Sequence, residues 1–572
     1  MNRMEGAQRM WLLGILALSL LLNVWGIGWG VPERWHPDEV TQRAENMVGT
    51  PTLNPHFFVY GGLHHYFIAA LAVLPVKVPN KFLCLMGYAA QSTLVVILSR
   101  LLSALLGTGV VFLTFLIGQE LFDPRAGLFA AALLATSMLL VNLSHFATVD
   151  VPSLFWFTLS CVLAIRVFRG GSGRSYLLAG LCSGVAAAVK YVGGLAFIVL
   201  IAAHFLGGSK THRLLVGALL MGAVGFILGN PVLLFAPFEF AEGFVAEMVF
   251  ASARGLGLSR AFLPLIFQLK EAMGVPLFLL SLAGLVHGVR LLASRKNRAS
   301  ILLALSMMLP YYFVVGSMRG PRAGPLLGPL PPLRYTLPIM PFLLLLAGKM
   351  LSDLVDARRR YTAHVARAGF AVALSYSIAY SASADLKFTY DSRYAARAWL
   401  LDNVQPGAVV ETTSYGPTVP RDKYVVVERP HDNQVADVAA SVGTSALRLQ
   451  TMVEDLEGWL TRAGLRTRNE HYVSWYEKAL LHYEEETSTF DVGTQGLESR
   501  APDVLVVSDL YAGRFRDRSS AEGAFFSDLS SGRTSYRKIA EFHYELPSWL
   551  DPPAEFVDPK IAVYSQKLTG RN

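Results

Sequence analysis

The sequence predicts a polytopic α-helical membrane protein that carries a soluble α/β domain after its last span. Of its 572 residues, 53% are hydrophobic and only 16% are charged, with a mean hydropathy of +0.41. A soluble protein of this length would have about a quarter charged residues. Apolar runs recur as far as residue 381, with basic clusters between them, and after residue 384 the composition becomes that of an ordinary soluble protein.

A transmembrane helix needs roughly 17–25 apolar residues, and about eleven stretches approach this length. They are 10–28, 101–121, 126–141, 151–168, 175–189, 193–205, 214–235, 272–292, 300–315, 335–354 and 364–381. The first is interpreted as a retained anchor, because it is too long for a signal peptide and lacks a convincing cleavage site.

Lysine and arginine in the short loops predict the orientation of the chain. The N-terminus with Arg3 and Arg9, and the loops 166–174, 210–213, 290–298 and 358–360, fall on one side when the spans are threaded. We expect this side to be the cytoplasm and the protein to lie in the inner (plasma) membrane. The net charge of +8 is then explained by membrane orientation, and nucleic-acid binding is a poor explanation.

The predicted domains are a transmembrane domain over 1–383, whose first outer loop is 30–100, and an extracytoplasmic α/β domain over 384–572. Within the loop, 57–73 and 82–98 are typical of interfacial helices, and the alternative for 82–98 is a continuation into the next span. In the outer domain the pattern predicts one helix at 391–404, strands at 409–410, 423–428, 503–508 and 561–564, and further helices near 439–463 and 472–483.

The stretch Arg34-Trp35-His36-Pro37-Asp38-Glu39 directly follows the first apolar run, so its two adjacent carboxylates lie at a membrane surface. Adjacent acids there add nothing to insertion and are awkward near lipid, which favours a role in chemistry. The alternative is a solvated loop in which Pro37, Asp38 and Glu39 begin a helix.

Three more polar residues lie at the outer ends of spans, and each has a structural alternative. Asp150 precedes an early helical Pro152 and suits an N-cap. Lys190 lies in an otherwise apolar region and could snorkel to the interface. Arg334, which follows a Gly/Pro-rich loop, runs against the positive-inside bias, which favours a phosphate or carboxylate partner over a role in orientation.

Together these residues suit chemistry on a lipid-linked phosphosugar. A carboxylate at the surface can remove a proton from an acceptor hydroxyl or amine. Lysine and arginine can hold a phosphate and stabilise its charge as a sugar leaves it. Because such a donor approaches sideways from the bilayer, an enzyme that uses it must place these groups at the ends of spans.

The Trp35-His36-Pro37-Asp38-Glu39 stretch resembles the acidic motif of GT-C glycosyltransferases, in particular the protein O-mannosyltransferases and the lipid A aminoarabinose transferases. Further similarity lies in the span 100–118, in Ala147-Thr148-Val149-Asp150-Val151-Pro152, at Lys190, and in Arg334-Tyr335-Thr336-Leu337-Pro338. The resemblance covers about the first 380 residues and does not extend to the C-terminal domain.

The resemblance implies a GT-C fold, a polyprenyl-phosphate-linked sugar donor, inverting transfer, and a site on the outer face of the membrane. It makes Asp38 the catalytic base, with Glu39 assisting in positioning the acceptor or the base. Asp150 becomes a second acidic site residue, and Lys190, Arg334 and its neighbour Tyr335 become candidates for binding the donor phosphate.

Several alternatives stay open. His36, Asp38 and Glu39 could ligate a divalent cation, but a fixed metal geometry needs ligands from elsewhere. The acceptor is a protein hydroxyl, a glycolipid or a polysaccharide. The aromatic group Tyr472, Trp475 and Tyr476 has helical spacing, which is more typical of core packing than of a sugar platform.

Two other classes of function compete with the transferase. A lipid-intermediate transporter or flippase would place polar groups near the bilayer midplane, whereas these span interiors are nearly free of charge. A membrane-anchored cell-envelope assembly protein would need only one or two helices as its anchor.

Overall fold

The computed structural model forms two compact units. It describes residues 6–50, 53–77, 81–237, 239–241, 243–244, 262–316, 322–324, 328–330, 332–357, 359–430, 462, 490–515 and 521–566. The first unit comprises Met1–Phe240, Leu256–Asp385 and Pro547–Glu555, and the second comprises Ala241–Gly255, Leu386–Leu546 and Phe556–Asn572. The expected helices at 439–463 and 472–483, with Tyr472, Trp475 and Tyr476, lie outside the described residues, apart from residue 462.

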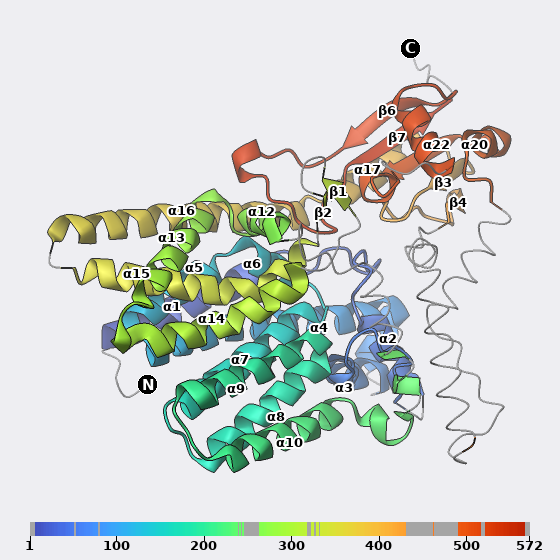
Figure 1. Ribbon diagram of the computed structural model, residues 1–572. Helices are drawn as coiled ribbons and strands as arrows, with labels where there is room; N and C mark the ends of the chain where they lie inside the picture. Colours follow the sequence, from blue (N-terminus) through green and yellow to red (C-terminus); the bar gives the residue numbers. More distant parts are fainter. Residues whose placement is uncertain are drawn as a thin grey trace. The chain divides into compact units, whose positions relative to one another are not determined.

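The described part of the first unit is mostly helical, as predicted (Figure 1). Its α-helices are α1 (Gly6–Val24), α2 (Thr41–Gly49), α3 (Leu63–Lys77), α4 (Lys81–Leu121), α5 (Pro124–Ala135), α6 (Met138–Ser144), α7 (Asp150–Phe168), α8 (Gly173–Val189), α9 (Ala196–Leu206), α10 (His212–Gly229), α12 (Phe262–Met273), α13 (Val275–Leu291), α14 (Arg295–Gly316), α15 (Met340–Val355) and α16 (Arg360–Thr389). The 3-10 helices are η1 (Tyr191–Leu195), η2 (Pro231–Leu234), η3 (Leu333–Ile339) and η4 (Ser548–Leu550), and β1 (Arg322–Gly324) pairs antiparallel with β2 (Gly328–Leu330).

Six helices among the described residues are long and apolar enough to cross a membrane, or seven if a bent pair counts as one span. These are Gly6–Val24, Ser92–Leu121, Asp150–Phe168, His212–Gly229, Arg295–Gly316 and Leu333–Val355, with α5 and α6 as the bent pair. Shorter apolar helices occupy Leu63–Val73, Gly173–Val189, Tyr191–Leu206 and Val275–Leu291. A multi-pass protein is therefore confirmed, while the count of about eleven spans stays a prediction.

Two expected segments take a more definite form in the structure. The stretch 82–98 continues into the next span, which is the second of its two interpretations, because it lies in the first half of the continuous helix α4. The expected span 126–141 bends by 61° between α5 and α6. The break leaves the Thr136 carbonyl without its helical partner, and the hydroxyls of Ser377 and Ser381 donate hydrogen bonds to it. Such substitution of backbone hydrogen bonds permits a broken helix at membrane depth.

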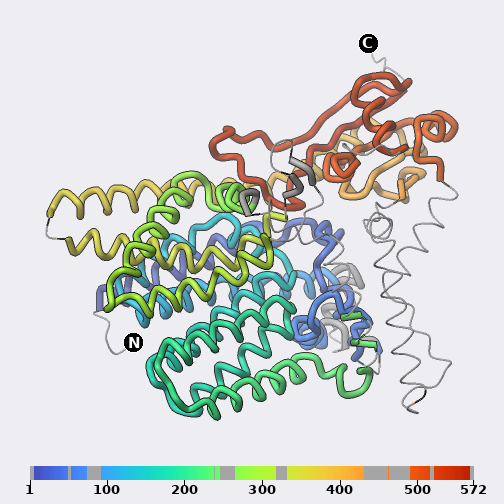
Figure 2. Tube along the Cα trace, viewed as in Figure 1, coloured from blue at the N-terminus to red at the C-terminus, as the bar shows by residue number. Residues whose placement is uncertain are grey.

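Helices α8 and α10 lie side by side because glycines let their backbones touch (Figures 1 and 2). A Cβ atom built on Gly180 would lie 1.9 Å from the Ala218 carbonyl oxygen, and one built on Gly184 would lie 1.8 Å from the Gly222 carbonyl oxygen. Small residues at these contacts provide the van der Waals packing that holds helices together in a membrane. Cys161 on α7 and Cys182 on α8 are buried and free, as expected of small core residues.

The second unit contains a five-stranded sheet in the order β4-β3-β5-β7-β6. Its elements are α17 (Ser392–Asn403), β3 (Val409–Thr412), β4 (Val425–Glu428), α20 (Thr494–Arg500), β5 (Val504–Ser508), α21 (Asp509–Ala512), α22 (Ala521–Ser530), β6 (Arg537–Phe542) and β7 (Ile561–Ser565). β3 pairs parallel with β4 and β5, and β7 pairs antiparallel with β5 and β6. Figure 2 shows that orange and red parts of the chain build this sheet together.

Both faces of the sheet are covered by apolar side chains, which makes the unit an α/β sandwich. Along β5, Val504 and Val506 pack with α17 on one face, whereas Leu505 and Val507 pack with α20 and α22 on the other. The helix at 391–404 and the four expected strands are confirmed. β6 was missed, since the charges in Arg537–Phe542 obscure a strand pattern there.

Candidate active site

Glu39 is buried in an ion pair that fixes the acidic loop to helix α4. The Arg100 guanidinium donates to both of its carboxylate oxygens, at 2.7 Å from Nε and 2.9 Å from Nη2. The backbone N–H of Ala147 donates to the same carboxylate at 2.9 Å. Arg100 also donates to the carbonyls of Ile27 and Trp29, at 2.9 and 2.5 Å. The pair thus ties the end of the first span, the acidic loop and the segment before α7 together.

Asp38, the next residue, turns its carboxylate to Arg334 at the start of η3. The Arg334 Nη1 atom donates to Asp38 Oδ2 at 2.5 Å, and the Asp38 side chain is 30% exposed. Burial raises the pKa of Asp38, but the charges of Arg334, His36 and Lys190 and the Arg334 hydrogen bond outweigh it, so the pKa falls to about 2. Asp38 is therefore ionised and accessible, in contrast with Glu39.

Asp150 and Lys190 form a second ion pair. The Lys190 Nζ atom donates to Asp150 Oδ1 at 2.7 Å, and it lies 5.3 Å from the centroid of the Tyr335 ring. The N-cap alternative for Asp150 was wrong, because Asp150 is itself the first residue of α7 and its cap position, Val149, makes no side-chain cap. Lys190 has an extended backbone between α8 and η1. This break in the helix lets its side chain reach Asp150.

His36 stabilises the acidic loop through a hydrogen bond and a ring contact. Its Nδ1 atom accepts a hydrogen bond from the Asp38 backbone N–H at 3.1 Å, and its ring centroid lies 4.2 Å from that of Phe146. Burial lowers the pKa of His36 to about 4, against the opposing charges of Asp38 and Glu39. The imidazole is therefore neutral at pH 7, with Nδ1 as acceptor, and it orients the turn that presents Asp38.

Three further residues belong to this site, and the sequence did not single them out. Burial and the Asp38 charge raise the pKa of Tyr60 well above its usual value. Arg43 of α2 stacks on Phe57, with Cζ 3.5 Å from the ring centroid, and its charge interacts with Tyr60 and Asp38. Glu555 accepts a hydrogen bond from the backbone N–H of Arg334 at 3.1 Å.

Glu555 is the most distant of these residues in the chain. It ends the segment Pro547–Glu555, which belongs to the first unit. Burial raises the pKa of Glu555, and the negative charges of Asp150 and Asp38 raise it further. Arg334 acts in the opposite direction but does not cancel this rise. No periodicity or motif marks Glu555, so only the folded chain could reveal it.

The site thus holds three carboxylates, Asp38, Asp150 and Glu555, among basic groups at the ends of spans. Carboxylates and cations gathered in one cleft, with displaced pKa values, are typical of catalytic sites. Among the described residues, no group of three or more histidine, cysteine or acidic side chains gathers as a metal site. His36 and Glu39 face Phe146 and Arg100 respectively, so they do not form one ligand set with Asp38.

Comparison with known proteins shows which proteins part of this chain is similar to. Residues 13–206 match the dolichyl-phosphate-mannose-protein mannosyltransferase family, and this region includes Asp38, Glu39, Asp150 and Lys190. The undecaprenyl phosphate-alpha-4-amino-4-deoxy-L-arabinose arabinosyl transferase of Pseudomonas aeruginosa (strain UCBPP-PA14) is 28% identical over 213 residues. This alignment covers 35% of the chain and 36% of that relative. The resemblance to the GT-C glycosyltransferases is confirmed.

Solved structures of two transferases also align with the chain. Apo ArnT from Cupriavidus metallidurans aligns with 99% of this chain and 100% of its own, at 15% identity and a TM-score of 0.47. The archaeal oligosaccharyltransferase AglB from Archaeoglobus fulgidus, in complex with an inhibitory peptide and a dolichol-phosphate, aligns with 96% of this chain and 76% of its own, at 13% identity and a TM-score of 0.48.

Proposed function

We propose that this protein is an integral-membrane glycosyltransferase that moves a sugar from a polyprenyl-phosphate donor to an acceptor on the outer face of the membrane. The matched family and the curated relative are both named for sugar donors of this class. The observation that carries the proposal is the paired arrangement of Asp38 with Arg334 and Asp150 with Lys190 in one site. In this topology the N-terminus is cytoplasmic and the α/β unit is extracytoplasmic, which the basic loops support.

The donor phosphate binds Lys190 and Arg334 in this proposal, with the Tyr335 ring beside Lys190. An oxyanion can replace the carboxylates that these cations hold in the resting site. Among the described residues no carboxylate forms an ion pair with Arg43, which makes Arg43 a third cation for the same phosphate. Several cations in a water-poor site stabilise the charge that develops on a leaving phosphate.

Donor binding also prepares Asp38 as a general base. In the resting site, the Arg334 charge opposes burial and holds the pKa of Asp38 at about 2, which makes Asp38 a weak base. Once a phosphate neutralises Arg334, burial is less opposed and the pKa of Asp38 rises. A base is most effective when its pKa approaches the working pH. The base is therefore strengthened only when the donor is in place.

The transfer is a single displacement with inversion. The acceptor oxygen or nitrogen attacks the anomeric carbon from the face opposite the phosphate, and Asp38 accepts the proton that it loses. The bond between the anomeric carbon and the phosphate oxygen breaks, and its electron pair leaves with the lipid phosphate, which stays on the cations. Glu39 and His36 are positioning residues in this proposal, because Glu39 pairs with Arg100 and the His36 ring accepts a hydrogen bond from the Asp38 backbone N–H.

The acceptor supplies the nucleophilic oxygen or nitrogen. The matched family is named for transfer to protein, which favours a protein hydroxyl, whereas a glycolipid or polysaccharide stays an alternative. No step of this mechanism involves a divalent cation.

The test is donor-dependent transfer by the purified protein in lipid, with a panel of polyprenyl-phosphate sugars and release of lipid phosphate as the readout. We expect Asp38→Asn to reduce release at least about a hundredfold, the usual contribution of a general base, while insertion is unchanged. Glu120→Gln, which removes a carboxylate from the exposed pair with Arg169, is the matched control and should keep full rates.

Full activity in Asp38→Asn would refute its role as base. Neither a lipid-intermediate transporter nor an envelope assembly protein would consume the donor. If wild type releases no lipid phosphate with any donor and candidate acceptor, and also binds no polyprenyl phosphate, the transferase class itself is wrong.

A further inference from the structure

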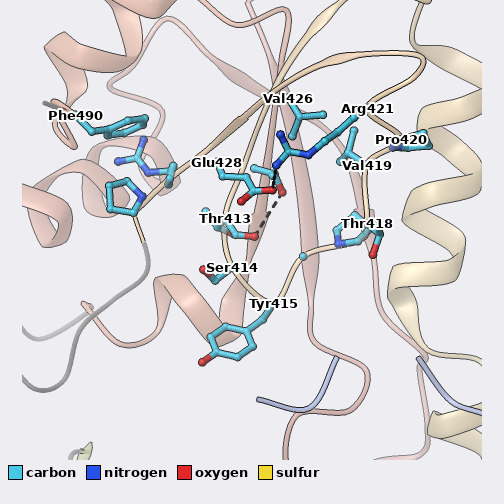
Figure 3. Close-up of a pocket in the computed structure, with 15 residues that line it drawn as sticks. Thr413, Ser414, Tyr415, Thr418, Val419, Pro420, Arg421, Val426, Glu428 and Phe490 are labelled. Atoms are coloured by element: carbon cyan, nitrogen blue, oxygen red, sulfur yellow. Dashed lines mark hydrogen bonds and ion pairs between the residues drawn. The ribbon is translucent and has the colours of Figure 1, made fainter. Parts of the chain in front are cut away.

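A cavity of about 900 Å³ lies in the second unit, at the carboxyl ends of the parallel strands β3 and β4 (Figure 3). Its wall is formed by the loop that follows β3, from Thr413 to Val419, by the end of β4 and by Phe490. The cavity therefore lies beyond the carboxyl ends of two parallel strands, the edge of an open α/β sheet at which ligands bind.

The lining combines hydroxyl groups with aromatic rings. Ser414 and Thr418 present small polar side chains along one loop, while Tyr415 and Phe490 add aromatic surface (Figure 3). Thr413 also lines the cavity, but it is buried and its hydroxyl accepts a hydrogen bond from the Ser508 backbone N–H at 2.9 Å. Hydroxyls both donate and accept hydrogen bonds, and a few polar groups within a partly aromatic wall are typical of small-ligand sites of this volume. A saccharide unit, which carries both hydroxyls and apolar C–H faces, matches this lining.

A buried arginine, Arg429, belongs to the lining of the cavity. Arg429 is only 3% exposed, and its Nη1 atom donates to Glu411 Oε1 at 2.7 Å. Arg500 donates to the same carboxylate, at 2.9 Å from Nε and 3.0 Å from Nη2. Two guanidinium groups thus share one buried carboxylate. The Nε atom of Arg429 has no hydrogen-bond partner among the described residues.

We propose that this cavity binds an anionic saccharide, one that carries a carboxylate or phosphate group. An anion would accept a hydrogen bond from Arg429 Nε and offset the one positive charge that the Arg429–Glu411–Arg500 cluster carries in excess. The hydroxyl-bearing loop after β3 would hold the sugar ring. The further step, that this saccharide is part of the acceptor, rests on the proposed glycosyltransferase function, but binding itself does not.

An exposed ion pair at the rim makes the proposal testable in both directions. Arg421 and Glu428 both line the cavity, and Arg421 Nη2 donates to Glu428 Oε1 at 2.5 Å (Figure 3). Their side chains are 68% and 64% exposed, so replacing either leaves the fold intact. Arg421→Gln removes a positive charge near the ligand, whereas Glu428→Gln removes a competing negative charge.

The experiment is calorimetric titration of the full-length protein in lipid nanodiscs with glucuronate, glucose 6-phosphate, glucose and inorganic phosphate. We expect both anionic sugars to bind more tightly than glucose and than inorganic phosphate. Arg421→Gln should weaken glucuronate binding by roughly threefold and Glu428→Gln should strengthen it by roughly threefold, as exposed charges do. Arg533→Gln, at an exposed pair with Asp528 in the same unit, should change nothing.

Equal binding of glucose and glucuronate would overturn the charge argument, and equal binding of phosphate and glucose 6-phosphate would overturn the saccharide argument. No binding, or shifts of the same sign in both rim variants, would also overturn the proposal. Because none of these variants lies in the transferase site, unchanged donor-dependent lipid phosphate release alongside absent glucuronate binding would refute this cavity alone.

Discussion

The Asp38 carboxylate and the Arg334 guanidinium lie 2.5 Å apart, although 296 positions separate them in the chain. The contact joins the loop after the first span to the start of a late one. It couples the expected base, Asp38, to an expected phosphate-binding cation, Arg334. A phosphate bound to Arg334 therefore changes the pKa of Asp38. The charge of Arg334 lowers the pKa of Asp38, in opposition to its burial.

Removal of Arg334 should shift the acidic limb of the pH–rate profile upward. The pKa of Asp38 in the free site is about 2, so wild-type kcat/KM should not fall with this group above about pH 4. In Arg334→Gln the opposing charge is gone and burial raises the pKa, so kcat/KM should decline as pH falls through the weakly acidic range. Arg334→Lys keeps the positive charge, so the acidic limb of its pH–rate profile should shift less than that of Arg334→Gln. Superimposable profiles for all three proteins would contradict this coupling.

Loss of the Glu39 carboxylate should destabilise the protein by about 3–5 kcal/mol, because it leaves the buried Arg100 guanidinium unpaired. The pKa of Glu39 in the folded protein is below its usual 4.5, as Arg100 outweighs burial. The stabilisation is therefore present at neutral pH and lost as pH falls below about 4.5. Thermal unfolding in detergent should show a lower Tm for Glu39→Gln, with partial recovery in Glu39→Gln/Arg100→Met. A Tm equal to that of wild type would show that the pair is dispensable.

Glu555 should act through its hydrogen bond to the Arg334 backbone rather than through its charge. Glu555→Gln keeps an acceptor oxygen and should reduce kcat/KM only slightly. Glu555→Ala leaves the Arg334 N–H unsatisfied, at a cost of about 1–3 kcal/mol, or roughly tenfold for each 1.4 kcal/mol. Steady-state kinetics with a polyprenyl-phosphate sugar compares the two. Equal and large losses in both variants would instead indicate that the carboxylate itself is required.

A methyl group at the contact of α8 and α10 should destabilise the helix bundle. Gly184→Ala places a Cβ 1.8 Å from the Gly222 carbonyl oxygen, so the backbones must separate, at a cost of about 1–3 kcal/mol. The matched control is Gly217→Ala on α10, where the new atom meets only the Leu177 side chain at 3.9 Å. That change should preserve or raise the Tm, because alanine is the better helix former. Equal Tm values for both variants would show that the close approach does not matter.

The local stretches around the acidic motif were sufficient to predict much of this site. Four residues of the site stand out in the sequence because each is a polar residue at the end of an apolar run. The structure pairs Asp38 with Arg334 and Asp150 with Lys190. The pattern could not separate the two acids of the motif. Asp38 and Glu39 are adjacent in sequence, yet Glu39 is enclosed by Arg100 while Asp38 is exposed to the site.

The composition of the chain by itself determined that this is a multi-pass membrane protein with a soluble α/β unit, because bilayer burial and sheet packing both impose local apolar patterns on the sequence. Only the tertiary structure decided that Glu555, Tyr60 and Arg43 join Asp38, and that the Glu39 carboxylate is paired with Arg100. The reason is physical. A hydrophobic period records which face of an element is buried, whereas an ion pair between distant residues leaves no periodic trace and exists only once the chain has folded.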